Sequence, residues 1–164
     1  MNRTKKEQLL LIAIVLVSAI ILGLSINAFR SGVSTPSQLD DRLSYLELIN
    51  DYRASKGLLP VQLNDKLDTS AQLKADDMAK YDYWQHDSPN GVKPWHWFNQ
   101  AGYGYTKAGE VLARCYDTPE DTVQGWINSE AHEATITGDY NDTGFGSYIK
   151  PDGCRVVIEH FGKK

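Results

Sequence analysis

Residues 126–132 read Trp126-Ile127-Asn128-Ser129-Glu130-Ala131-His132 and place a tryptophan, a hydroxyl and an imidazole at three-residue intervals. A strong helix start precedes them, because Thr118 can cap a helix, Pro119 suits its first position and two acidic residues follow. Residues three apart lie on one face of a helix, so a helix that runs this far would align Trp126, Ser129 and His132. We expect Trp126 to pack in the core. The alternatives for His132 are a ligand, a catalyst and a packed surface residue.

Three helices are predicted before this stretch. Apolar residues at helical spacing predict the first over residues 38–56, and the second begins near Asn64, a good N-cap. The second helix is expected to bury an apolar face made of Leu67, Ala71, Ala75, Met78 and Ala79. Its opposite face is expected to carry Lys66, Lys74, Asp76 and Lys80. A short helix over residues 95–100 follows, where Trp95 and Trp97 either line an apolar groove or cover the helix pair.

The segments closest to the C-terminus predict strands. Glycines at 102, 104 and 109 suggest a pliable loop that leads into residues 110–113. Residues 143–149 and 155–161 are strand candidates, and the turn at residues 151–153 between them predicts a hairpin. Helices first and strands last favour the α+β class, with helices packed on an antiparallel sheet.

The N-terminus predicts a membrane anchor. Cations at Arg3, Lys5 and Lys6 precede residues 8–29, which carry no charge. As a helix these 22 residues would reach about 33 Å, enough to cross a bilayer core, with the N-terminus cytoplasmic. The predicted organisation is a basic tail (1–7), a transmembrane helix (8–29), a linker (30–38) and an extracellular domain (39–164). The alternative is a cleaved signal peptide, with a cleavage candidate at residues 23–25, and a secreted domain.

Charge and cysteine content restrict the partners and the compartment. The first 30 residues hold four basic residues and one acidic residue, so the remainder has a formal net charge of −7. This balance argues against binding nucleic acid. The two cysteines, Cys115 and Cys154, lie in the predicted exported part, where one disulfide is expected; two free thiols are the alternative in a reducing setting.

The residues that could carry chemistry form no short motif. The candidates are His86, Glu110, Ser129, Glu130, His132 and Glu133. His132-Glu133 does not start a zinc-protease HExxH motif, because Ile136 takes the place of the second histidine. Composition and spacing alone therefore favour surface or partly packed histidines over ligands.

The order of several small motifs adds a resemblance. They are Asn50 to Arg53 with Gly57-Leu58, His86 after aromatic residues, Gly102-Tyr103, Gly109-Glu110, Trp126-x-x-Ser129-x-x-His132, Gly144-x-Gly146 and Phe161-Gly162. In this order they resemble the CAP superfamily, also called the SCP-like extracellular domain, in its short bacterial form. The resemblance covers residues 39–162.

The resemblance implies a fold and a site. It implies an α-β-α sandwich around a three-stranded antiparallel sheet, and a cleft where two histidines and two acidic residues bind a divalent metal. Carried over, these are His86, Glu110 and His132, whereas Ser129 stands where the second acidic residue of larger members lies. Two imidazoles and one carboxylate would hold Zn²⁺ or another divalent metal with an open position for water. His96 and His160 have no counterpart in the family's histidine pair, and His160 is expected to be structural.

Three functions follow from these expectations. The first is a non-enzymatic, membrane-tethered module that binds a small-molecule, lipid or peptide ligand in a cleft lined by His86, Glu110, Ser129 and His132. The alternative is a metal-dependent hydrolase of extracellular peptide or cell-envelope polymer, in which Glu110 would take the proton of metal-bound water. The third, nucleophilic catalysis by Ser129 with His132, ranks last because neighbours on one helix rarely give the geometry. The missing second acid favours the binding module over an enzyme.

Overall fold

The computed structural model describes residues 36–164, with side chains from residue 41 onward. The elements in chain order are α2 (Pro36–Ser55), β1 (Gln62–Leu63), α3 (Asp65–Tyr81), α4 (Trp95–Gln100), β2 (Lys107–Arg114), α5 (Pro119–Ile127), α6 (Glu130–Ile136), β3 (Asp142–Ile149) and β4 (Arg155–Lys163). The transmembrane helix predicted over residues 8–29 lies outside the described residues. Within residues 36–164, no helix combines the length and the apolar composition that crossing a bilayer requires.

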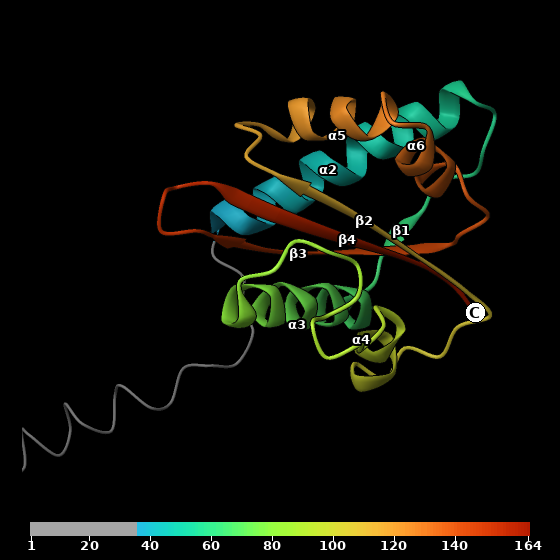
Figure 1. The fold of residues 1–164 in the computed structure, drawn as a ribbon. Helices are drawn as coiled ribbons and strands as arrows, with labels where there is room; N and C mark the ends of the chain where they lie inside the picture. The colour runs from blue at the N-terminus through green and yellow to red at the C-terminus, as the bar shows by residue number, and fades with distance from the viewer. Residues whose placement is uncertain (1–35) are drawn as a thin grey trace, which may run out of the picture. The chain divides into compact units, whose positions relative to one another are not determined.

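A four-stranded sheet lies between two layers of helices. The strand order is β1-β3-β4-β2, with β4 antiparallel to both of its neighbours and β1 parallel to β3. Helices α2, α5 and α6 cover one face of the sheet, and α3 and α4 cover the other (Figure 1). The α+β class and the β3–β4 hairpin are therefore confirmed. The expectation of three purely antiparallel strands is wrong, because the two-residue strand β1 adds a parallel edge.

Helix α3 packs directly on the backbone of β3. A Cβ atom on Gly144 would lie 2.2 Å from the backbone nitrogen of Asp68, and one on Gly146 would lie 2.3 Å from the carbonyl carbon of Ala71. The Gly144-x-Gly146 motif thus removes the side chains that would hold the helix away from the sheet. Because α3 lies this close to β3, its side chains reach the strand backbone: Asp68 Oδ1 accepts from Phe145 N at 2.9 Å, and Gln72 Oε1 accepts from Ser147 N at 3.1 Å.

The opposite face holds the larger apolar core. Trp126 is buried, as predicted, and its Nε1 donates to the carbonyl of Leu112 at 3.1 Å. Its ring and that of Phe145 flank Tyr45 of α2. Arg53, also from α2, is buried here and donates to the carbonyl oxygens of Leu59, Ile136 and Gly138. The motif around Arg53 therefore serves to join α2, the following loop and the end of α6.

The structure corrects the predicted stripe of Trp126, Ser129 and His132. Helix α5 begins after the cap Thr118, as predicted, but it ends at Ile127, and α6 starts separately at Glu130. Ser129 between them has extended backbone angles (φ −109°, ψ 114°). Consequently Ser129 is the N-cap position of α6, and the three residues do not share one continuous helix.

Three further expectations about residue placement are wrong. Lys74 is completely buried although its charge suggested the outer face of α3, and Ala79 is exposed. Gly109 belongs to β2 and is buried, so the pliable loop ends before it. The N-cap Asn64 is confirmed, because its side chain accepts from Lys66 N at 3.1 Å.

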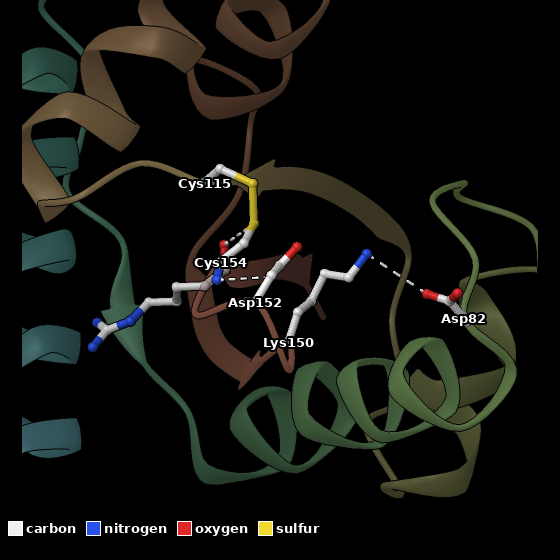
Figure 2. The surroundings of a disulfide bond; sticks show 6 residues. Asp82, Cys115, Lys150, Asp152 and Cys154 are labelled. Carbon is white, nitrogen blue, oxygen red and sulfur yellow. Dashed lines mark hydrogen bonds and ion pairs between the residues drawn. A yellow bond between two sulfur atoms is a disulfide. The ribbon is translucent and has the colours of Figure 1, made fainter.

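The predicted disulfide is confirmed. Cys115, which follows β2, is bonded to Cys154, which precedes β4, over a sequence separation of 39 residues (Figure 2). The backbone supports the same junction, since Cys115 N donates to the carbonyl of Arg155 at 2.8 Å. The bridge therefore joins the end of β2 to the turn of the β3–β4 hairpin.

Candidate functional site

Glu110 and His160 form a buried pair on the α3 face of the sheet. They lie opposite each other on β2 and β4, and His160 Nε2 is 2.9 Å from Glu110 Oε2. The other ring nitrogen, Nδ1, is 2.8 Å from the hydroxyl of Ser70 on α3. Phe98 of α4 stacks on the imidazole with ring centroids 4.5 Å apart. His160 is thus held on three sides and has no contact with solvent.

His86 extends this arrangement to the surface. Its Nδ1 lies 2.6 Å from Glu110 Oε1, and the His86 side chain is 54% exposed whereas that of Glu110 is 1% exposed. Both carboxylate oxygens of Glu110 therefore have an imidazole partner. A hydrogen-bonded series runs from Ser70 through His160 and Glu110 to His86.

The charges of these groups fix which nitrogen carries each proton. Burial alone would raise the pKa of Glu110, but the hydrogen bonds from His160 and His86 and the charge of Lys74 keep it below its usual value. An ionised carboxylate only accepts hydrogen bonds, so His86 Nδ1 and His160 Nε2 must both donate. In the neutral form of His86, Nε2 then carries no proton and can act as a ligand or a base. The same hydrogen bond to Glu110 raises the pKa of His86, whereas burial lowers that of His160.

His132 lies on α6, in the helix layer on the other side of the sheet from α3 (Figure 1). It is half-buried, and its pKa is lowered first by burial and then by the positive charge that His86 can carry. Among the residues that the sequence singled out, the structure joins His86 directly to Glu110, whereas in the described residues His132 interacts with His86 through charge alone.

The fourth expected residue, Ser129, is not joined to them. Within residues 36–164, its hydroxyl has no hydrogen bond to His86, Glu110 or His132, and it makes no side-chain cap bond to α6. Ser70 does contact an imidazole, His160, but both residues are fully buried and closed to a substrate. Neither serine is therefore placed as a nucleophile.

The donor set fits two metal ligands better than three. In the part of the chain that the structure describes, no three His, Cys, Asp or Glu side chains are grouped to hold a metal ion. Glu110 cannot ligate without giving up a bond to His86 or His160. The candidate donors that remain are the imidazoles of His86 and His132, with Glu110 hydrogen-bonded to the first. This is the outer-shell arrangement in which a carboxylate orients a ligating histidine.

Sequence reasoning missed two buried residues beside the site. His160 was expected to be structural, and its bond to Glu110 was not foreseen. Lys74 was placed on the outer face of α3, but its Nζ donates to Tyr83 Oη at 3.1 Å and to the carbonyl oxygens of Gln85 at 3.0 Å and His86 at 2.5 Å. The spacing of Lys74 from Ala71 and Met78 was an available signal, because it places the lysine on the buried face.

Comparison with known proteins identifies the family. Residues 46–161 match the model of the cysteine-rich secretory protein family, also called CAP. The chain therefore belongs to this family, and the resemblance seen in the sequence is confirmed.

Individual relatives agree with this assignment. The uncharacterized protein YkwD of Bacillus subtilis is 36% identical over 110 residues, which are 67% of this chain and 42% of that protein. The uncharacterized membrane protein YlbC of the same bacterium is 28% identical over 102 residues, or 62% of this chain and 30% of that protein. The chain thus spans less than half the length of the curated relatives that it matches.

Solved structures share the fold at lower identity. An extracellular protein containing an SCP domain from Bacillus anthracis superposes with a TM-score of 0.70 and 24% identity, over 82% of this chain and 45% of that one. A crystal structure of NaASP2 with Zn²⁺ superposes with a TM-score of 0.55 and 14% identity, over 82% of this chain and 87% of that one.

Proposed function

We propose that residues 39–164 form an extracellular, non-enzymatic ligand-binding domain whose binding groups are the imidazoles of His86 and His132. The observation that carries this proposal is the 2.6 Å contact between His86 Nδ1 and Glu110 Oε1, which leaves Nε2 of this exposed histidine available to a ligand when the ring is neutral. The domain would be tethered to a membrane by residues 8–29, or released if that segment is cleaved. The extracellular SCP-domain protein and the membrane protein YlbC among the relatives support this location.

A divalent metal is the first ligand to test at this pair. Neutral imidazoles suit Zn²⁺ and its transition-metal neighbours, whereas Mg²⁺ and Ca²⁺ prefer oxygen ligands. His86 Nε2 and His132 would hold the ion, and Glu110 would orient His86 without ligating. A bound metal would supply a positively charged centre with open positions for a small-molecule, lipid or peptide group.

The proposal is tested by Zn²⁺ titration calorimetry on residues 31–164. We expect binding to the wild type and its loss in His86→Ala and in His132→Ala. His96→Ala is the matched control, because His96 is exposed on α4 and outside the site. Equal Zn²⁺ affinity in all four proteins would contradict the assignment of the two histidines.

The hydrolase alternative has weaker support. A general base must receive a proton from water, and Glu110 is nearly unexposed with both oxygens already bonded. A peptide-library cleavage assay with and without a chelator tests this alternative. Chelator-sensitive turnover that disappears in Glu110→Gln would favour the enzyme over the binding module.

A further inference from the structure

Lys74 connects the α3 helix to the segment that carries His86. This segment, residues 82–94, joins α3 to α4 and contains no helix or strand. The ammonium group of Lys74 has three protons, and it meets three acceptors within residues 83–86, namely one tyrosine hydroxyl and two carbonyl oxygens. Its hydrogen-bonding capacity is therefore used completely inside the protein.

The burial of Lys74 indicates a specific role. A lysine ammonium is costly to remove from water, and an apolar residue would fill the space on α3 without that cost. The lysine is nevertheless fully buried, and its partner Tyr83 donates in turn to Asp77 Oδ2 at 2.6 Å. The bonds to Gln85 and His86 involve backbone carbonyls, so they fix the path of the chain whatever side chains the segment carries.

The last of these bonds acts at the binding residue itself. Lys74 Nζ holds the carbonyl of His86, while Glu110 holds the Nδ1 of the same residue. Two fixed points, one on the backbone and one on the ring, determine where Nε2 is directed. The positive charge of Lys74 also acts on Glu110, the carboxylate that anchors the ring.

We propose that Lys74 is the positioning residue of this site: it fixes the backbone at His86 so that the imidazole meets Glu110 and holds Nε2 in one orientation. The expected effect of Lys74 on ligand binding rests on the proposed function. The expected effect of Lys74 on the conformation of the segment 82–94 does not depend on any ligand.

The first measurement is amide hydrogen exchange of the full-length, metal-free chain, comparing wild type with Lys74→Met. We expect exchange in residues 83–88 to accelerate by about tenfold or more, while the amides of β3 and β4 keep their protection. Lys80→Met is the matched control, since Lys80 lies on the same helix, is exposed and contacts Tyr81 instead. Unchanged exchange in residues 83–88, or the same acceleration throughout the sheet, would overturn the proposal.

The second measurement is the Zn²⁺ affinity of wild type, Lys74→Met, His86→Ala and the double variant. We expect Lys74→Met to weaken Zn²⁺ binding by roughly 10-fold or more, as for other outer-shell changes, and to add no further loss in the His86→Ala background. An equal loss in both backgrounds would show that Lys74 does not act through His86. If the wild type binds no Zn²⁺, the proposed metal function fails, and the exchange experiment still decides the role of Lys74.

A second variant covers the case in which Lys74→Met does not fold. Tyr83→Phe removes one of the three acceptors and leaves the buried ammonium with two carbonyl partners. We expect a smaller acceleration, confined to the same residues. No acceleration in this folded variant would contradict the inference.

Discussion

Glu159 is a fully buried carboxyl group on β4, paired in register with Val111 of β2 and Phe145 of β3. Thr143 Oγ1 is 2.7 Å from its Oε1 and 3.0 Å from the carbonyl oxygen of His160. Thr143 is the donor in both contacts, and its hydrogen bond to Glu159 partly opposes the effect of burial on the pKa of that carboxyl. Burial is the larger effect and raises the pKa of Glu159 well above its ordinary value, which favours the protonated, neutral form.

Replacing Glu159 by Gln should therefore change how stability depends on pH. A carboxyl whose pKa is raised in the folded state stabilises fully below its unfolded pKa, and this contribution is lost as pH rises toward the folded pKa. Between the two pKa values the wild type should lose about 1.4 kcal/mol of unfolding free energy per pH unit relative to Glu159→Gln. For a domain of this size that is roughly 5 °C in Tm per pH unit.

Urea denaturation of both proteins at several pH values measures this difference. We expect the stability of Glu159→Gln relative to wild type to increase steadily from pH 5 upward. Glu133→Gln is the control with the opposite sign, because hydrogen bonds from Lys56 and Tyr52 lower the pKa of Glu133. The stabilisation from Glu133 is present above its unfolded pKa and is lost as pH falls. A difference between wild type and Glu159→Gln that stays constant from pH 5 to 8 would refute the assignment of a neutral carboxyl.

Three further outcomes are expected. Gly146→Ala should destabilise the fold by about 3 kcal/mol, because its Cβ would overlap the α3 backbone, whereas Gly104→Ala, with open space around its Cβ, should change thermal unfolding little. Cys115→Ser should cost about 4 kcal/mol in the loop-entropy model, and the intact wild type should be two hydrogens lighter than its reduced form, with Cys154 as the partner. Zn²⁺ binding should weaken from pH 7.5 to 5.5 as His86 is protonated. Because the pKa of His86 is raised, the weakening should begin at a higher pH than for an ordinary histidine. A calorimetric profile that stays flat over this range would exclude histidine ligands.

The sequence predicted the parts of the fold that depend on local signals. The caps Asn64 and Thr118 begin α3 and α5, and the turn at residues 151–153 makes the hairpin. The break between α5 and α6 was missed because the run of residues 126–132 has helical spacing on both sides of Ser129. Backbone angles at one residue, which spacing does not encode, separate the two helices.

The site was predicted only where single residues carried the signal. His86 and Glu110, both named from the sequence, are in contact, but the position of Glu110 between two imidazoles depends on the β2–β4 register. That register pairs Glu110 with His160, 50 residues away, and no local pattern fixes it. Lys74 was misplaced because its charge was given more weight than its helical spacing.

The close contact between α3 and β3 also protects the protein from association. Strand β1 covers only the first two residues of β3, at Asp142 and Thr143, so the outer edge of the next residues could accept a strand from another molecule. Asp68 and Gln72, one helical turn apart, bind the backbone groups at Phe145 and Ser147 that such a strand would need. Replacing both side chains by alanine should leave the domain with an exposed, largely apolar edge, and we expect that form to aggregate at concentrations where the wild type remains monodisperse.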